Sequence, residues 1–417
     1  MSAADRLLAR MSGVDAAALA RLRTTAGRAL LDELAASGGA EDGTLLRTLT
    51  ALRTRYDPAL VAAAVTQARL RTRARVKFGA DADRMFFTPE GLEQATRAVV
   101  AAHHARRFTA AGAAGVLDLC CGNGGDLVAF ARAGLPVHGV DRDPLVVEVA
   151  RANAASLGVA GLVTVECADV TRVPLTDRPA AFVDPGRRRS AGGGSTRVFN
   201  PNGYSPPFRF LADVAAAVPA TGAKLAPGIP HDLVPAGAEA EWVSVDGRVK
   251  EAALWWGPLA TAARRATLLP AGVTLVGAGL GPPAVGPPGE WLYEPDGAVI
   301  RAGLVAEVAA MLPGGRLLDP TIAYVAADAP AAAATPYTRG YRVTDVLPFS
   351  LKRLRELLRV REVGILTVKK RGSAVDPEQL RRQLRLRGPA TATVVLTRVA
   401  GAPTALLCEP AEGLRAG

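Results

Sequence analysis

The sequence is poor in the features that mark secreted and membrane proteins. It has four cysteines in 417 residues, and none of them shows the paired spacing of a zinc site. Cys120 and Cys121 are adjacent, which is poor geometry for sharing one metal ion, so we expect reduced thiols and no metal. No run of 18 apolar residues occurs, and the N-terminus has no basic segment followed by an apolar one. We therefore expect a cytoplasmic protein that does not contact membranes.

Acidic residues are scarce at both ends of the chain. The net charge is +11, but residues 111–336 hold 17 Lys and Arg against 21 Asp and Glu. Residues 1–110 hold 17 against 11, and residues 337–417 hold 16 against 7. Basic flanks around a slightly acidic middle favour a nucleic-acid-binding enzyme. An arginine-rich protein with solvated basic faces is the alternative. With 49% hydrophobic residues, the chain is long enough for two or three domains.

The most informative stretch of the sequence is glycine-rich and lies in the first third of the chain. It reads Val-Leu-Asp-Leu-Cys-Cys-Gly-Asn-Gly-Gly-Asp from Val116 to Asp126. A short apolar run that ends in glycines and precedes a helical pattern predicts a buried parallel strand, a tight turn and a helix. Asp118 is expected at the carboxyl end of that strand, where open α/β sheets bind ligands.

Three further apolar runs end in an acidic residue. Asp141 lies 19 residues after Gly122, Asp169 closes the next run, and Asp184 begins Asp-Pro-Gly-Arg. An acid about 20 residues after the glycines is also typical of nicotinamide dinucleotide sites. Such sites seat a pyrophosphate on Gly-x-Gly-x-x-Gly, whereas here an acid opens the motif and would repel a pyrophosphate. The pattern therefore favours a ligand that carries an ammonium group or hydroxyls.

These four motifs, in this order, resemble the class I methyltransferases that use S-adenosylmethionine (SAM). The resemblance implies a Rossmann-like α/β fold, and it implies that Asp141 binds the ribose hydroxyls and Asp169 the adenine amino group. Cys120 stands where the family usually has its first glycine, which is the one visible departure. The cofactor-binding residues implied are Asp118, Cys120, Gly122, Gly124, Asp141 and Asp169.

The fourth motif is expected to face the methyl acceptor, with Asp184, Pro185 and Arg187 as the catalytic residues. Asp184 is a candidate base or hydrogen-bond acceptor, and Arg187 is a candidate for holding a phosphate or a base edge. No cysteine follows the motif until Cys408, which argues against methylation of a pyrimidine C5. A weaker similarity is to the Lys-Asp-Lys-Glu set of ribose 2′-O enzymes, with Asp184 alongside Lys77, Lys224 and Glu251.

The C-terminal stretch is strongly basic and predicts a small α+β module. Residues 351–358 and 376–384 read as helices, residues 363–368 as a strand, and residues 391–398 with 405–409 as a closing hairpin. This stretch resembles the THUMP-like domain at the C-terminus of a bacterial class I methyltransferase family. Because THUMP domains occur in RNA-modifying enzymes, the resemblance implies RNA contacts through Lys369, Lys370, Arg371, Arg381 and Arg385.

We predict four parts: a helical domain (1–85), a methyltransferase domain (86–275), a connector with one helix (276–336) and a basic THUMP-like domain (337–417). One helix is expected over residues 91–108 and a flexible loop over residues 190–195. The expected function is SAM-dependent methylation of a nucleotide in tRNA or rRNA. A methyltransferase acting on a small molecule or protein is the first alternative, and an RNA-binding protein with a relic SAM site is the second.

Overall fold

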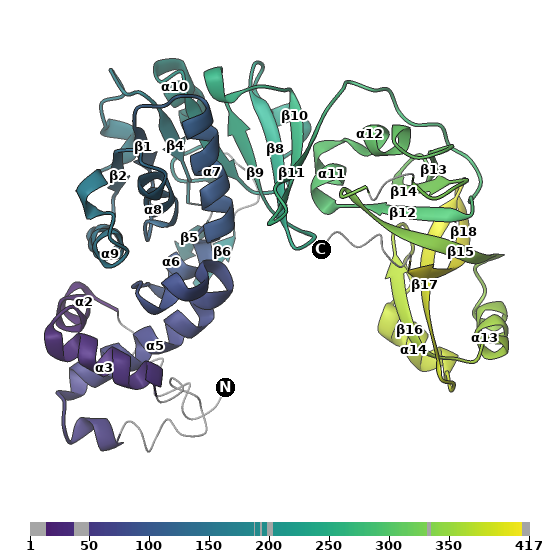
Figure 1. Ribbon diagram of the computed structural model, residues 1–417, viewed down its shortest axis with the longest axis horizontal. Helices are drawn as coiled ribbons and strands as arrows, with labels where there is room; N and C mark the ends of the chain where they lie inside the picture. The colour runs from purple at the N-terminus through teal and green to yellow at the C-terminus, as the bar shows by residue number, and fades with distance from the viewer. Residues whose placement is uncertain are drawn as a thin grey trace. The chain divides into compact units, whose positions relative to one another are not determined.

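The computed structural model describes residues 14–36, 50–186, 188–191, 194–197, 203–331 and 335–410. The chain divides into two compact units, and Figure 1 labels most of their helices and strands. The first unit comprises Met1–Leu225, Ile229–Ala238 and Leu254–Thr261. The second comprises Ala226–Gly228, Glu239–Ala253 and Ala262–Gly417. Across the described residues, none of the helices has both the length and the apolar character needed to cross a lipid bilayer.

The first unit is built on a parallel sheet with the strand order β3-β2-β1-β4-β7. Its strands are β1 (Val116–Leu119), β2 (Val137–Asp141), β3 (Val163–Cys167), β4 (Ala181–Val183) and β7 (Thr221–Leu225). β1, β4 and β7 are buried along their whole length, as expected for parallel strands covered on both faces. Because the strands are parallel, their carboxyl ends meet at one edge, which confirms the predicted α/β fold.

Helices and aromatic side chains form the core around this sheet. The helices that follow or precede its strands are α7 (Ala98–Ala110), α8 (Gly125–Arg132), α9 (Pro144–Ser156) and α10 (Arg209–Ala217). Phe182 of β4 packs near Phe108, Phe130 and Trp255, with ring centroids 5.6–6.3 Å apart. Short 3-10 turns complete the unit: η1 (Gly79–Asp83), η2 (Ala160–Leu162), η3 (Val170–Arg172), η5 (His231–Leu233) and η6 (Gly257–Leu259).

The N-terminal part of the first unit is helical, as predicted. It contains α2 (Ala16–Leu22), α3 (Thr25–Ala36), α5 (Pro58–Phe78) and α6 (Pro89–Gln94). Leucines of α2 and α3 pack with α5 and with Val149 and Ala152 of α9 in one buried cluster. Asp57 caps α5 through two backbone N–H groups, and Pro58 occupies the first turn. This helical part therefore packs directly on a helix of the sheet domain.

Two local predictions in the first unit are wrong. The single helix expected over residues 91–108 is two helices, because Ala95 has extended backbone angles (φ −55°, ψ 135°) between α6 and α7. The break leaves Thr96 outside both helices, where its side chain serves the site described below. Of the loop expected over residues 190–195, residues 190–191 and 194–195 belong to an antiparallel pair of strands, β5 (Arg188–Ala191) and β6 (Gly194–Arg197), and residues 192–193 lie outside the described residues.

The second unit begins with four strands in the order β11-β10-β8-β9. They are β8 (Glu239–Val245), β9 (Arg248–Trp255), β10 (Arg264–Leu269) and β11 (Val273–Val276). Asp246 and Gly247 both have positive φ, 52° and 72°, in the two-residue turn from β8 to β9. Asp-Gly is typical of such tight hairpins, so the two residues themselves account for the turn. The last two residues of β9 belong to the first unit, where Trp256 N donates to Thr221 O of β7 (2.9 Å).

A second sheet, of seven strands, completes the second unit in the order β13-β14-β12-β15-β18-β17-β16. Its strands are β12 (Trp291–Pro295), β13 (Arg316–Asp319), β14 (Ile322–Ala327), β15 (Thr338–Pro348), β16 (Val363–Lys370), β17 (Ala390–Val399) and β18 (Ala402–Pro410). The predicted connector thus supplies three strands of this sheet and two helices instead of one, α11 (Gly297–Ala302) and α12 (Val305–Ala310). Gly303 ends α11 in the left-handed conformation (φ 73°) and so divides the expected helix.

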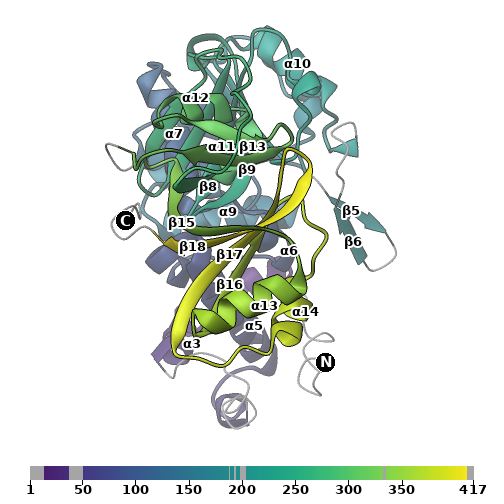
Figure 2. The same ribbon diagram turned by 90° about the vertical axis from the view of Figure 1, so that its right-hand side faces the viewer.

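Two helices cover one face of this sheet. α13 (Leu351–Val360) and α14 (Pro377–Leu384) lie side by side in front of β16 and β17 in Figure 2. Leu354 and Leu358 of α13 share a buried cluster with Leu380 and Leu384 of α14 and with residues of β16, β17 and β18. Asp376 caps α14 by accepting from Gln379 N (2.7 Å), as the sequence predicts. The opposite faces of both helices carry charge, with Lys352, Arg353, Arg359 and Arg382 exposed.

Candidate functional site

The glycine-rich turn joins β1 to α8 through a run of left-handed backbone. Cys120, Gly122 and Gly124 have φ values of 65°, 54° and 81°. Cys120 adopts the left-handed conformation that glycine takes at least cost, so the turn keeps its shape despite the substitution. Cys120 N and Cys121 N both donate to Val140 O (2.9 and 3.1 Å), which ties the turn to the end of β2. Burial raises the pKa of both thiols well above the usual range, so they are not thiolates.

Asp118 lies within β1, one residue before its end, and is 1% exposed. Its Oδ2 atom has no hydrogen-bond partner in the structure. Burial raises the pKa of Asp118 well above the usual value, and the nearby carboxylates of Asp126, Asp184 and Asp141 raise it further. A buried carboxylate without a partner is costly to the fold unless a ligand completes it. A ligand cation, such as an ammonium group, would supply that missing partner.

Asp141 and Asp169 follow at the ends of the two neighbouring strands. Asp141 accepts from Gly122 N through Oδ2 and from Asp143 N through Oδ1, each at 3.1 Å. Burial nevertheless raises the pKa of Asp141. Asp169 is exposed, and its Oδ1 accepts from Thr171 N (3.0 Å) and Thr171 Oγ1 (2.8 Å), which lowers its pKa. The structure thus brings all six predicted cofactor-binding residues to one edge of three adjacent strands.

Asp184 follows β4 at the same edge. Its backbone N–H donates to Leu119 O (3.1 Å), and its Oδ2 accepts from Lys224 Nζ of β7 (2.6 Å). Pro185 is buried, and Gly186 forms a two-way backbone bridge with Ser205 (2.8 and 3.0 Å). Arg187 lies outside the described residues. Asp184 and Pro185 are therefore held in place on both sides, by β1 and by the segment around Ser205.

Hydrogen bonds connect Lys224 not only to Asp184 but also to a cluster of three residues that the sequence analysis did not identify as site residues. Its Nζ also donates to Thr96 Oγ1 (2.8 Å) and to Gln94 O (3.4 Å). Thr96 Oγ1 donates to Asp126 Oδ2 (2.6 Å), and Asp126 Oδ1 lies 2.8 Å from Nδ1 of His104. Thr96, Asp126 and His104 come from different segments, so no local pattern could have predicted this cluster.

Lys77, which the similarity to ribose 2′-O enzymes grouped with Asp184 and Lys224, is held by backbone carbonyls. Its Nζ donates to three backbone carbonyls at the end of α6: Leu92 O (2.7 Å), Glu93 O (2.9 Å) and Ala95 O (2.8 Å). Burial, with Lys224 nearby, lowers the pKa of Lys77 to about 8, so the amine is still protonated at pH 7. Losing a proton would leave its lone pair facing a carbonyl oxygen. Lys77 therefore acts as a C-terminal cap of α6.

Two fully buried carboxamides hold the segment that precedes α6. Gln67 of α5 exchanges hydrogen bonds with Phe87 O (2.7 Å) and Phe87 N (3.1 Å). Asn153 of α9 accepts from Phe86 N (2.7 Å) and donates to Phe86 O (3.0 Å) and Asn123 O (2.8 Å). The segment is thereby fastened to the glycine-rich turn. The side chain of Asn123 is 3% exposed, and neither its Oδ1 nor its Nδ2 has a partner.

The predicted RNA-binding residues lie in the second unit and differ in their surroundings. Lys369 pairs with Glu294 (2.5 Å) and lies over the ring of Tyr341, and Arg371 donates to Ala323 O (3.2 Å). Arg381 donates to Leu366 O (3.1 Å) and pairs with Glu378. Lys370 and Arg385 are exposed. Arg385 ends α14 in the left-handed conformation (φ 50°), so it does not continue the helical face of Arg381.

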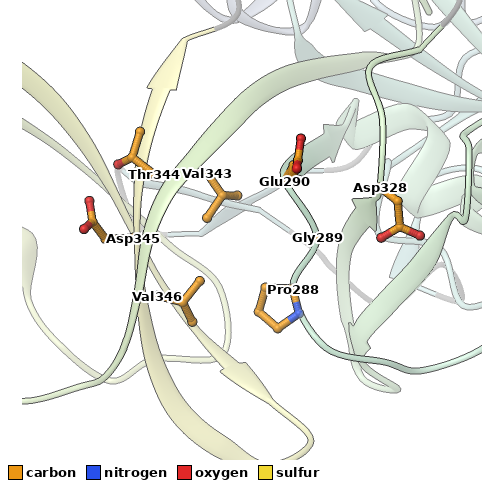
Figure 3. A pocket seen from close by; sticks show the side chains of 8 residues that line it. All are labelled: Pro288, Gly289, Glu290, Asp328, Val343, Thr344, Asp345 and Val346. Carbon is orange, nitrogen blue, oxygen red and sulfur yellow. The ribbon is translucent and has the colours of Figure 1, made fainter.

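A surface hollow of about 420 Å³ is also found in the second unit, and Figure 3 shows its lining. Glu290, Asp328 and Asp345 line it with Pro288, Gly289, Val343, Thr344 and Val346. None of the predicted site residues contributes to it. In the described part of the chain, no three His, Cys, Asp or Glu side chains are grouped as a metal site would require.

Comparisons with known proteins agree with this geometry. A family model described as "Methyltransferase domain" matches residues 116–183, "THUMP domain-like" matches residues 338–410, and "Domain of unknown function (DUF8688)" matches residues 15–74. Proteins from two strains of Mycobacterium tuberculosis, each named an uncharacterized S-adenosylmethionine-dependent methyltransferase, are 36% identical over 361 residues. Those matches cover 82% of this chain and 95% of each relative.

A solved structure shows the same fold. It is a putative methyltransferase from Porphyromonas gingivalis W83, with a TM-score of 0.71 and 24% sequence identity. The match covers 86% of this chain and 92% of that one, so the likeness includes most of both units.

Proposed function

Since this chain belongs to the class I SAM-dependent methyltransferases with a C-terminal THUMP-like domain, we propose that its methyl acceptor is a nucleotide in RNA. The chain is an enzyme, and its cofactor is S-adenosylmethionine, which supplies the methyl group. The identity of the acceptor, the roles of the individual site residues and the boundaries between the helical, methyltransferase and THUMP-like parts are the proposal.

The six residues at the carboxyl ends of β1, β2 and β3, here called the cofactor edge, have the chemical groups needed to bind SAM. The unpartnered Oδ2 of Asp118 suits the α-amino group of the methionine part, and Asp141 stands where the ribose hydroxyls would bind. Cys120, Gly122 and Gly124 let the backbone pass close to the cofactor. We assign Asp169 to the adenine. The left-handed backbone of Cys120 also counters the view that this substitution marks a relic site.

Among the residues that the structure describes, Asp184 and Pro185 are the ones that we propose to contact the methyl acceptor. Asp184 lies on the same edge as the cofactor residues, next to β1, and it is partly exposed. A carboxylate there can accept a hydrogen bond or a proton from an N–H or O–H acceptor group. Arg187, which follows in the sequence, is proposed to bind a phosphate or a base edge.

An exposed basic surface on α13 and α14 is the observation that carries the RNA proposal. Lys352 and Arg359 are exposed and Arg355 is half-buried, and their spacing of i, i+3 and i+7 places all three on one face of α13. Arg355 Nη2 donates to Gln383 O of α14 (2.8 Å), which places this face beside the end of α14. Exposed arginines follow there, Arg382, Arg385 and Arg387. This surface lies within the THUMP-like region and suits a phosphate backbone.

Salt-dependent binding to bulk tRNA and rRNA tests the proposal. Replacing Arg359 and Arg385 with Glu should weaken binding and flatten the log–log salt dependence by about 1.4, at roughly 0.7 per lost phosphate contact. Arg248→Glu with Arg264→Glu is the matched control, because both residues are exposed in the second unit outside the THUMP-like region. Equal losses in both variants, or no binding by the wild type at low salt, would refute the RNA proposal.

A further inference from the structure

A chain of buried hydrogen bonds runs from the acceptor-side carboxylate into the interior of the first unit. It passes from Asp184 to Lys224 (2.6 Å), on to Thr96 (2.8 Å) and Asp126 (2.6 Å), and reaches His104 (2.8 Å). Lys224, Thr96 and Asp126 are 3%, 4% and 6% exposed, and His104 is fully buried. A polar chain at such depth is costly unless each member is satisfied, so its geometry is tightly constrained.

The direction of the hydrogen bonds gives Lys224 a defined place between two carboxylates. Its ammonium group donates directly to Asp184 and also to the hydroxyl of Thr96, which in turn donates to Asp126. Although burial alone would raise the pKa of Asp126, its contacts with His104, Lys224 and Thr96 hold that pKa below the usual value. Asp126 is therefore an anion that stabilises the lysine from the side away from Asp184.

Each member of the chain comes from a separate element. Asp184 follows β4, Lys224 lies in β7, Thr96 occupies the break between α6 and α7, and Asp126 lies in the first turn of α8. Gln94 O, at the end of α6, adds a third acceptor for Lys224 at 3.4 Å. The same break that interrupts the predicted helix thus places Thr96 where it can orient the lysine. α8 also follows the glycine-rich turn, so the chain connects the cofactor edge with Asp184.

We propose that Lys224 is a positioning residue for methyl transfer, and that Thr96 and Asp126 hold it in place. Lys224 fixes the orientation of the Asp184 carboxylate and keeps it ionised, so that Asp184 presents an oxygen to the acceptor group. The inference rests on the methyltransferase activity and on the proposed role of Asp184, and it is independent of whether the acceptor is RNA.

Thr96→Val tests the proposal because it removes the hydroxyl without removing a charge. The assay measures transfer of a radiolabelled methyl group from SAM to RNA from a strain lacking the gene, with the protein and small-molecule fractions in parallel. We expect kcat to fall about tenfold or more, as for a lost hydrogen bond to a charged group, with KM unchanged. SAM affinity by calorimetry should stay within about twofold of the wild type. Thr96→Ser should bring kcat back to within about threefold of the wild type.

The matched control is Thr397→Val, a buried threonine of the second unit whose hydroxyl has no partner in the structure. It should leave kcat unchanged. Lys224→Met provides the second readout, since losing the cation should move the acid limb of the kcat–pH profile upward by making Asp184 easier to protonate.

Two results would overturn the proposal. One is a folded Thr96→Val enzyme with wild-type kcat, and the other is an acid limb that does not move in a folded Lys224→Met enzyme. If Lys224→Met fails to fold, Thr96→Val and Thr96→Ser decide the question alone. If the methyl label appears in the protein or small-molecule fraction instead, the RNA proposal is refuted. The proposal for Lys224 can still be tested, because the variants are then compared on the fraction that accepts the label.

Discussion

Asp118 and Asp126 offer a matched pair of buried carboxylates with opposite expected behaviour. Both are at most 6% exposed, and both lie at the cofactor edge. Asp118 Oδ2 has no partner, whereas both oxygens of Asp126 are bonded, one to Thr96 and one to His104. Replacing each with Asn removes one charge and almost no volume. The two substitutions therefore distinguish a carboxylate that binds a ligand from a carboxylate that stabilises the fold.

We expect Asp118→Asn to lose SAM affinity without losing stability. A hydrogen bond between charged groups is worth about 1.5–3 kcal/mol, so the dissociation constant should rise roughly 10- to 150-fold in calorimetry. Asp126→Asn should instead lower the free energy of unfolding by about 1.5–3 kcal/mol or more, because an amide nitrogen would face a donor. An Asp118→Asn protein that binds SAM normally but unfolds more easily would refute this reasoning.

The pH dependence supplies an independent check on Asp118. Burial and the neighbouring carboxylates raise its pKa above the usual 3.8, so acidification removes the charge that attracts a cofactor ammonium. SAM affinity should therefore increase as the pH rises through that pKa. Without cofactor, the folded protein binds more protons than the unfolded chain, so its free energy of unfolding should fall over the same pH range. Asp118→Asn should abolish both trends, and a pH-independent wild-type affinity would contradict the assignment.

Three further substitutions probe the rest of the edge. Asp141→Ala should weaken SAM binding at least roughly tenfold in calorimetry, because it removes the charged acceptor that we propose for the ribose hydroxyls. Asp184→Ala should bind SAM nearly as well as the wild type while its methyl transfer drops about a hundredfold, and unchanged turnover would exclude Asp184 from the mechanism. Asn153→Ala leaves Phe86 N, Phe86 O and Asn123 O without their partner, so denaturant unfolding should show a loss of at least about 3 kcal/mol.

The sequence predicted that the proposed cofactor-binding residues meet at one edge of the sheet, because that arrangement is encoded locally. Each acidic residue of the motifs lies at or near the end of a short apolar strand. Parallel pairing of these strands is enough to place their carboxyl ends at the same edge of the sheet. The turn from Cys120 to Gly124 is likewise a property of consecutive residues. The cap of α14 by Asp376 and the Asp246-Gly247 hairpin were predictable for the same reason.

What the sequence could not predict depends on contacts between distant segments. The helical pattern over residues 91–108 gives no sign of the break at Ala95, because the break is stabilised from outside the helix. Lys77 caps α6 from α5, and Lys224 reaches Gln94 O and Thr96 from β7. Strands β12, β13 and β14 were missed for a similar reason, since their pairing with one another and with β15 defines them more than their composition does.

The break between α6 and α7 links the helical N-terminal part to the chemistry of the site. Two lysines from different elements meet carbonyls of this short segment, Lys77 at Leu92, Glu93 and Ala95, and Lys224 at Gln94. Gln67 and Asn153 fix the residues just before it. A helix terminus offers unpaired carbonyls, and here two ammonium groups occupy them. The helical part is therefore best understood as the element that sets the position of Thr96, and through Lys224 that of Asp184.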